Sequence, residues 1–254
     1  MTRLLFFIFF IFYRYDFFAD DRLIIQAPMT KPVLLPTPRA LLFDLDGTLA
    51  DTAPDLAAAV NLLRTAQGLL PTPYALLRPV ASAGARGLIG VALNVTPTDN
   101  GYDALRETFL TNYAAQIAVH STLFDGVDAL LLSLQQQDLQ WGIVTNKPAR
   151  LTDALVPQIG LQHAGCVVSG DTTPHAKPHP EPLFEAARRL KLSPGQCWYV
   201  GDDLRDIEAG KAAGMVTIAA AWGYCGDTAP LDWQADMIAQ HPLELLSLLR
   251  EKRA

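Results

Sequence analysis

The chain has 254 residues, of which half are hydrophobic and 18% are charged, and its formal net charge is −6. This length and composition are typical of a soluble globular protein with one large domain, or with a core domain and a smaller insert. The acidic balance disfavours a nucleic-acid partner, because binding a phosphate backbone requires a basic surface. The three cysteines are widely spaced and form no C-x-x-C pair, which favours reduced thiols and a cytoplasmic location over disulfides or a zinc site.

Residues 1–28 differ in composition from the rest, since seven of the eleven phenylalanines lie between Phe6 and Phe18. Their apolar run of about ten residues is too short for a membrane-spanning helix, which needs about 20. We therefore expect no stable membrane span. We favour a nonessential extension or a true start at Met29, and an export signal and a membrane contact stay open as alternatives.

From Arg39 onward, short apolar runs alternate with amphipathic helical patterns. Strands are predicted at five runs that end in polar or glycine-rich turns: RALLFDLD (39–46), LQWGIVTN (139–146), AGCVVSG (164–170), QCWYVGDD (196–203) and MVTIAAAW (215–222). Helices are predicted at 126–137, 149–159, 181–190 and 204–213. This alternation predicts an α/β fold with a doubly wound, Rossmann-like parallel sheet that helices cover on both faces.

The first interval between strands is exceptional, because more than ninety residues separate Asp46 from Trp141. This interval contains helical patterns at 55–68, 85–94 and 100–118 and no convincing strand. We therefore expect an all-helical insert at 55–121 in a core that comprises residues 39–54 and 122–254.

Polar side chains suited to chemistry follow four of the predicted strands. Ligands bind beyond the carboxyl ends of parallel strands, so we expect these side chains to meet at one edge of the sheet. The set comprises Asp44, Asp46, Thr145, Asn146, Lys177, Asp202, Asp203 and Asp206.

The carboxylates in this set repel one another unless a cation lies among them. Oxygen ligands without a histidine or cysteine companion select Mg²⁺. A divalent cation, a lysine and short hydroxyl and amide donors are what a phosphoryl group requires. The sequence therefore predicts a Mg²⁺ site that acts on a small-molecule phosphate ester.

Taken singly, the residues of the set also have ordinary interpretations. Asp46 followed by glycine is a common turn, and Lys177 alone is a solvated loop charge. A calcium-binding EF-hand loop is disfavoured, because Thr48 and Asp55 stand where that loop needs an acidic or amide residue and a glutamate.

Two further patterns were considered as ligand sites. His175 and His179 have a spacing that metal ligands use, but prolines surround them and no second ligand pair is evident, so we interpret them as loop histidines. The glycines of GARGLIG (84–90) follow no strand, which argues against dinucleotide binding.

The segments FDLDGTL, VTNK, AKP and GDDLRD resemble, in order and spacing, the four motifs of the haloacid dehalogenase (HAD) superfamily of phosphatases. The resemblance covers residues 39 to 254 and implies that the helical insert is a cap over the active site. It implies that Asp44 is the nucleophile, which forms an aspartyl-phosphate, and that Asp46 is the general acid and base. It also implies that Thr145, Asn146 and Lys177 bind the phosphate, and that Lys177 neutralises charge on the nucleophile.

The same resemblance implies a metal-binding set. Asp44, the backbone carbonyl of Asp46, and Asp202 are the implied Mg²⁺ ligands, with Asp203 or Asp206 beside them. Aspartate at position 46 favours a phosphomonoesterase over a dehalogenase, with a phosphomutase as the alternative.

Substrate choice is expected to depend on the cap stretch RPVASAGARGLIG. There Ser82, Gly84 and Arg86 can offer a hydroxyl, backbone amides and a guanidinium to a substrate carboxylate. The alternative is that Arg86 lies along a helix surface with its charge in water.

The chain also resembles the phosphoglycolate phosphatase group. Within that group SAGARG, AVHSTLFDGV, WGIVTNKP and VGDDLRDIEAG are most similar to N-acetylmuramic acid 6-phosphate phosphatases, which act in cell-wall recycling. Phosphoglycolate enzymes more often carry serine at the position of Asp203. We therefore expect N-acetylmuramic acid 6-phosphate as the substrate, with 2-phosphoglycolate as the alternative. A catalytically silent phosphate-binding protein or a membrane-tethered protein is the alternative from another class.

Overall fold

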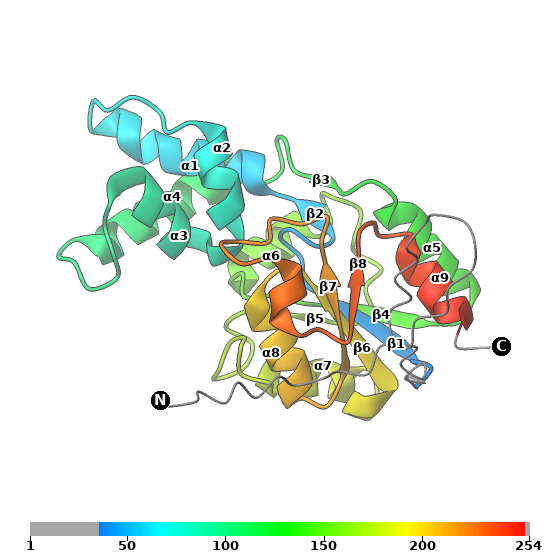
Figure 1. Cartoon of the computed structure of the whole chain (residues 1–254). Helices are drawn as coiled ribbons and strands as arrows, with labels where there is room; N and C mark the ends of the chain where they lie inside the picture. The colour runs from blue at the N-terminus through cyan, green and yellow to red at the C-terminus, as the bar shows by residue number, and fades with distance from the viewer. Residues whose placement is uncertain (1–35, 252–254) are drawn as a thin grey trace, which may run out of the picture. The chain divides into compact units, whose positions relative to one another are not determined.

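The computed structural model describes residues 36–251. Its main feature is a six-stranded sheet in the order β5-β4-β1-β6-β7-β8, in which every strand pair is parallel (Figure 1). The strands are β1 Ala40–Phe43, β4 Gln140–Val144, β5 Val167–Val168, β6 Cys197–Gly201, β7 Val216–Ala220 and β8 Met237–Ala239. The predictions for residues 1–28, including a start at Met29, lie outside the described residues.

The strands form where the apolar runs predict them, because both faces of this sheet are covered. Every residue of β1, β6 and β7 is buried, as expected of parallel strands between two helical layers. The predicted fold class is confirmed. Strand β8 was not predicted, because its three residues are too few to show a strand pattern.

Helices cover both faces of the sheet. They are α5 Val127–Gln136, α6 Ala149–Leu155, α7 Glu181–Arg189, α8 Leu204–Ala212 and α9 Glu244–Glu251. Leu41 and Phe43 of β1 share a buried cluster with residues of α5, α6 and α9. Leu42 points to the opposite face and shares a cluster with residues of α7 and α8, so the sheet is doubly wound.

The chain between β1 and β4 is mostly helical, as predicted. Its elements are β2 Ala50–Asp51, α1 Ala53–Ala66, α2 Tyr74–Leu77, the 3₁₀ helix η1 Arg78–Ala83, α3 Gly84–Leu93, α4 Tyr102–Ala115 and β3 Thr122–Leu123. The two short strands β2 and β3 pair antiparallel and hold the two ends of this segment side by side. Helix α2, η1 and the β2–β3 pair were not predicted, because they are too short to show a periodicity.

The stretch Tyr74–Leu93 is long and apolar enough to cross a membrane, by length and composition only. In the structure it consists of α2, η1 and α3, with Gly84 at a φ of 58° between the last two. Leu77, Leu88 and Ile89 of this stretch are buried in the larger hydrophobic cluster. Packing within the protein therefore accounts for part of its apolar character, since 28% of the apolar window is buried.

Candidate active site

The predicted residues meet at the carboxyl ends of three neighbouring strands. β1 pairs with both β4 and β6, so Asp44 after β1 lies between Thr145 after β4 and Asp202 after β6. A cavity of about 260 Å³ opens there. Its walls include most of the predicted set: Asp44, Asp46, Ser82, Gly84, Arg86, Thr145, Asn146, Lys177, Asp203 and Asp206. Asp202 is fully buried behind this wall.

Lys177 is a buried cation of the site. Its Nζ lies 2.8 Å from Oδ1 of Asp44 and 2.7 Å from Oδ1 of Asp206, and it donates a hydrogen bond to the carbonyl oxygen of Val144 at 2.9 Å. Burial by itself lowers the pKa of Lys177, but the charges of Asp206 and Asp44 together outweigh it. The net result is a raised pKa, so the ammonium stays charged.

Asn146 fixes the loop that carries this lysine. Its Nδ2 donates to the carbonyl oxygen of Lys177 at 2.9 Å, and the backbone N–H of Lys177 donates to Oδ1 of Asn146 at 2.9 Å. The side-chain amide is therefore occupied in positioning Lys177. Phosphate binding by Asn146 stays a prediction. With the side chain bonded to Lys177, the backbone of Asn146 would have to bind the phosphate.

Three carboxylates form a tight buried cluster. Asp44, Asp202 and Asp206 each offer one oxygen, and these atoms lie within 4.8 Å of one another. Burial raises the pKa of Asp44 to about 7, against the opposing charge of Lys177. Burial and the charges of Asp44 and Asp206 hold the pKa of Asp202 well above its usual range. One lysine does not balance three carboxylates, and this hard oxygen donor set fits Mg²⁺.

Local hydrogen bonds hold Asp202 in place. It accepts from Oγ1 of Thr48 at 3.0 Å, from the backbone N–H of Tyr224 at 2.9 Å and from Oγ of Ser82 at 3.0 Å. Gly47 has a φ of 91°, and a Cβ there would lie 2.1 Å from a carboxylate oxygen of Asp202. The glycine is therefore required both by its backbone conformation and by the close approach of Asp202.

The two neighbours predicted for the metal site differ in their environment. Asp206 joins the carboxylate cluster. Asp203 is instead the N-cap that precedes α8, and it accepts hydrogen bonds from the backbone and side chain of Arg205 at 2.9 and 2.7 Å. Although burial raises the pKa of Asp203, its hydrogen bond from Arg205 keeps it below the usual value. Arg205 also donates to the carbonyl oxygen of Ser82 at 2.8 Å. Asp203 and Arg205 therefore connect α8 to the helical segment.

Lys147 is a site residue to which the sequence analysis gave no role. Its Nζ lies 2.8 Å from Oδ1 of Asp46, which also accepts from Oγ1 of Thr52 at 2.5 Å. The ammonium is buried and lies 4.6 Å from the centre of the Tyr113 ring. The sequence shows only that a charged residue follows Thr145 and Asn146 at the end of a strand. It does not show the ion pair, because Asp46 is far away in the chain.

Lys147→Met should lower kcat/KM by about 10- to 100-fold, because Asp46, the predicted general acid and base, loses the cation that orients it. The loss should be only part of the roughly 100- to 10,000-fold that general acid–base catalysis contributes, since Asp46 itself is kept. Steady-state phosphate release measures this, with circular dichroism to verify folding. The matched control is Lys211→Met, which removes an exposed lysine of α8 and should leave kcat/KM unchanged. Unchanged turnover in Lys147→Met would show that this ion pair serves only stability.

Mg²⁺ should stabilise the protein more at pH 8 than at pH 6. Because burial raises the pKa of Asp44 to about 7, the metal-free folded state binds protons that the unfolded state has released, so its stability falls as pH rises toward 7. Mg²⁺ must displace those protons. For each proton displaced, the affinity for Mg²⁺ should rise about tenfold per pH unit. Thermal unfolding with Mg²⁺ or with EDTA at both pH values measures the effect. An equal shift of Tm at the two values would contradict it.

A family model described as haloacid dehalogenase-like hydrolase matches residues 38–214. The chain belongs to this family. A "Phosphoglycolate phosphatase" of Xanthomonas campestris is 48% identical over 210 residues, which cover 82% of this chain and 95% of that protein. An "N-acetylmuramic acid 6-phosphate phosphatase" of Pseudomonas putida is 42% identical over 213 residues, which cover 83% of this chain and 96% of that protein.

Solved structures of HAD hydrolases agree with the fold. A crystal structure described as a predicted phosphoglycolate phosphatase from Haemophilus somnus aligns with a TM-score of 0.75 and 26% identity, covering 84% of this chain and 98% of that chain. The chain is a HAD-type phosphatase. Phosphatases of this family generally use Mg²⁺, and the carboxylate cluster is a site that could bind it.

Proposed function

We propose that this HAD phosphatase hydrolyses a small phosphate monoester that also carries a carboxylate, and that its preferred substrate is N-acetylmuramic acid 6-phosphate. The supporting observation is that the cavity lined by the cluster of Lys177, Asp44 and Asp206 is also lined by two arginines from the helical segment, Arg86 and Arg106. The guanidinium of Arg106 also pairs with Glu107 at 2.8 Å. The cluster suits the phosphate, and a guanidinium suits a carboxylate. The two anionic ends of such an ester therefore have partners in the same cavity.

The proposed reaction uses the residues in the roles that the family implies. An oxygen of Asp44 forms a bond to phosphorus as the ester oxygen leaves, and Asp46 gives that oxygen a proton. Asp46 then takes a proton from water, which attacks the aspartyl-phosphate and releases inorganic phosphate. Lys177 stabilises the negative charge on Asp44 and on the transferring group. Mg²⁺ held by Asp44, Asp202 and the carbonyl of Asp46 would supply further charge neutralisation.

The apolar part of the cavity wall favours an amino sugar. Phe109, Leu110, Tyr113 and Leu151 line the cavity beside the charged groups. A two-carbon acid has almost no apolar surface to place against them, whereas N-acetylmuramic acid presents ring CH groups and two methyl groups. The similarity to the Pseudomonas putida phosphatase agrees with this choice.

2-Phosphoglycolate is the second candidate. It is favoured by the Xanthomonas campestris relative, which bears the name of that activity and is 48% identical. The cavity of about 260 Å³ is also small. It lies just below the range of roughly 300 to 1,000 Å³ usual for drug-sized ligands.

The deciding experiment compares kcat/KM for the two esters with the full chain and Mg²⁺. A preference of about a hundredfold, or about 2.7 kcal/mol of differential transition-state binding, assigns the substrate. Equal low values on both esters would contradict both candidates and leave the phosphatase chemistry intact.

Arg86→Met should raise KM for a carboxylate-bearing ester by about tenfold or more, because a lost charged hydrogen bond costs about 1.5 to 3 kcal/mol. The same variant should hydrolyse p-nitrophenyl phosphate, which has no carboxylate, as the unchanged enzyme does. Arg188→Met removes an exposed arginine that pairs with Glu185, away from the cavity, and serves as the matched control. If Arg86→Met lost the same activity on the carboxylate-bearing ester and on p-nitrophenyl phosphate, Arg86 would have a structural role only.

We further propose that residues 55–121 form a cap on a core of residues 39–54 and 122–254. The hydrogen bonds from Ser82 to Asp202 and from Arg205 to Ser82 support contact between the two across the site. A cytoplasmic location stays a prediction, and it agrees with the three free cysteines.

A further inference from the structure

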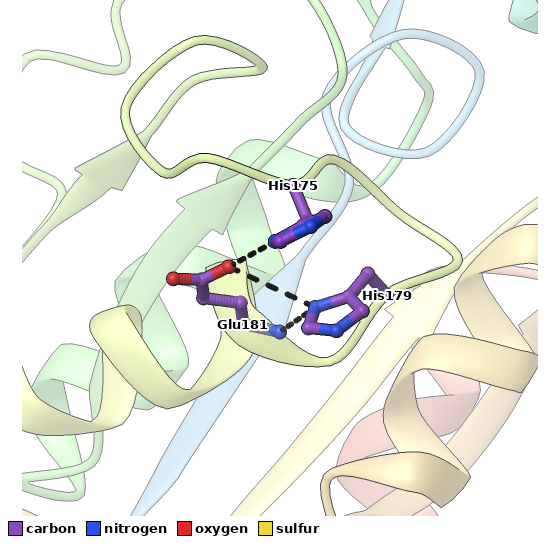
Figure 2. Close-up of side chains that lie close together, drawn as sticks. All are labelled: His175, His179 and Glu181. Atoms are coloured by element: carbon purple, nitrogen blue, oxygen red, sulfur yellow. Dashed lines mark hydrogen bonds and ion pairs between the residues drawn. The ribbon is translucent and has the colours of Figure 1, made fainter.

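Two histidines and a glutamate converge on the loop between β5 and α7 and at the start of α7. Figure 2 shows the side chains of His175, His179 and Glu181 pointing toward one another. Nδ1 of His175 lies 2.8 Å from Oε2 of Glu181, and Nδ1 of His179 lies 3.9 Å from the same oxygen. One ligand atom from each residue falls within a group whose members are all within 4.8 Å of one another. Glu181 was not predicted as a third ligand, because the spacing of the two histidines does not indicate it.

The three side chains are held together by contacts with one another. The imidazole rings stack with centroids 4.4 Å apart, and the backbone N–H of Glu181 donates to Nδ1 of His179 at 3.2 Å. An ion would use the other ring nitrogen of His179 or replace that hydrogen bond. The side chains of His175 and His179 are 62% and 50% exposed, so an ion can reach them directly from solvent.

The donor chemistry of this group differs from that of the carboxylate cluster. Imidazole nitrogens suit zinc and similar transition metals, whereas all-oxygen sets suit Mg²⁺. Two histidines and one glutamate with an open fourth position are a known zinc donor set.

We propose that His175, His179 and Glu181 form a second metal site, which takes Zn²⁺ or a similar transition-metal ion. The site shares no residue with the carboxylate cluster, and it does not depend on the substrate proposed above. Lys177 lies between the two histidines in the sequence. An ion held by all three ligands therefore ties together the two sides of the loop that carries Lys177.

The first test is calorimetric titration of the full chain with ZnCl₂ in saturating Mg²⁺ and a phosphine reductant. Mg²⁺ occupies the carboxylate cluster, and burial raises the pKa of Cys225 to about 11, so its thiol competes poorly for Zn²⁺ at neutral pH. We expect one Zn²⁺ to bind at this site, and His179→Ala and Glu181→Gln each to weaken that binding by at least about tenfold.

His241→Ala is the matched control, since the side chain of His241 is 40% exposed and its Nε2 lies 3.5 Å from one carboxylate, that of Asp125. Its Zn²⁺ affinity should equal that of the unchanged protein. Equal Zn²⁺ affinity in the unchanged protein and in His179→Ala, or an equal loss in His241→Ala, would overturn the proposal and indicate adventitious surface binding only.

A second measurement needs no substitution. Hydrogen exchange with and without Zn²⁺, again in saturating Mg²⁺, reports where the ion binds. We expect the largest slowing within residues 171–182. Slowing that is absent there, or larger at another part of the chain, would overturn the proposal.

Discussion

Asp44→Asn is expected to abolish phosphate release while the protein stays folded. The amide cannot form the aspartyl-phosphate, so kcat should fall by at least about a thousandfold. The fold should tolerate the change, because Lys177 keeps its ion pair with Asp206 at 2.7 Å. Phosphate release under saturating Mg²⁺, together with urea unfolding, measures both properties.

The same substitution also has an expected effect on the stability of the metal-free protein. The substitution removes one of three buried carboxylates that repel one another, so in EDTA at pH 8 the variant should be at least as stable as the unchanged protein. Asp153→Asn, at an exposed position of α6, is the matched control and should change neither turnover nor stability. Turnover that persists in Asp44→Asn would refute the covalent mechanism.

Lys177→Met should destroy turnover and also destabilise the fold. The lysine is buried between Asp44 and Asp206, at 2.8 and 2.7 Å, so its removal leaves buried carboxylates without their cation. Breaking a buried ion pair by removing one partner costs about 3 to 5 kcal/mol. The free energy of unfolding in urea, measured in EDTA, should fall by about that amount.

A double variant separates charge from chemistry. Adding Asp206→Asn to Lys177→Met removes one of the unbalanced carboxylates, so we expect it to recover part of the lost stability and none of the turnover. The matched comparison is Asp203→Asn in the same background. Asp203 pairs with Arg205, so its substitution should recover nothing. Equal recovery from the two substitutions would contradict the assignment of Lys177 to the cluster of Asp44 and Asp206.

The proposed zinc site adds a practical point for these assays. His175 and His179 are exposed, whereas the carboxylate cluster is buried. Traces of transition metal in a preparation therefore have a proposed binding site other than the cluster. Measurements of Mg²⁺ dependence are best made with the His179→Ala variant beside the unchanged protein.

The sequence by itself determined the sheet and the identity of the main catalytic candidates. Strands buried on both faces appear as continuous apolar runs, and the residues at their carboxyl ends can be read directly after each run. Asp44, Thr145 and Asp202 could be brought together in this way, because parallel strands place their carboxyl ends at one edge. The short elements β8, β2 and β3 escaped, since two or three residues carry no period.

Only the tertiary structure decided which polar groups pair with one another. The sequence predicted the same role for Asp203 and Asp206 beside the metal. In the structure Asp203 pairs with Arg205, whereas Asp206 pairs with Lys177. Lys147 is separated by a hundred residues from Asp46, its ion-pair partner. Side-chain pairing across such distances depends on how the helical segment and the loops lie on the sheet, and local sequence patterns carry no information about that geometry.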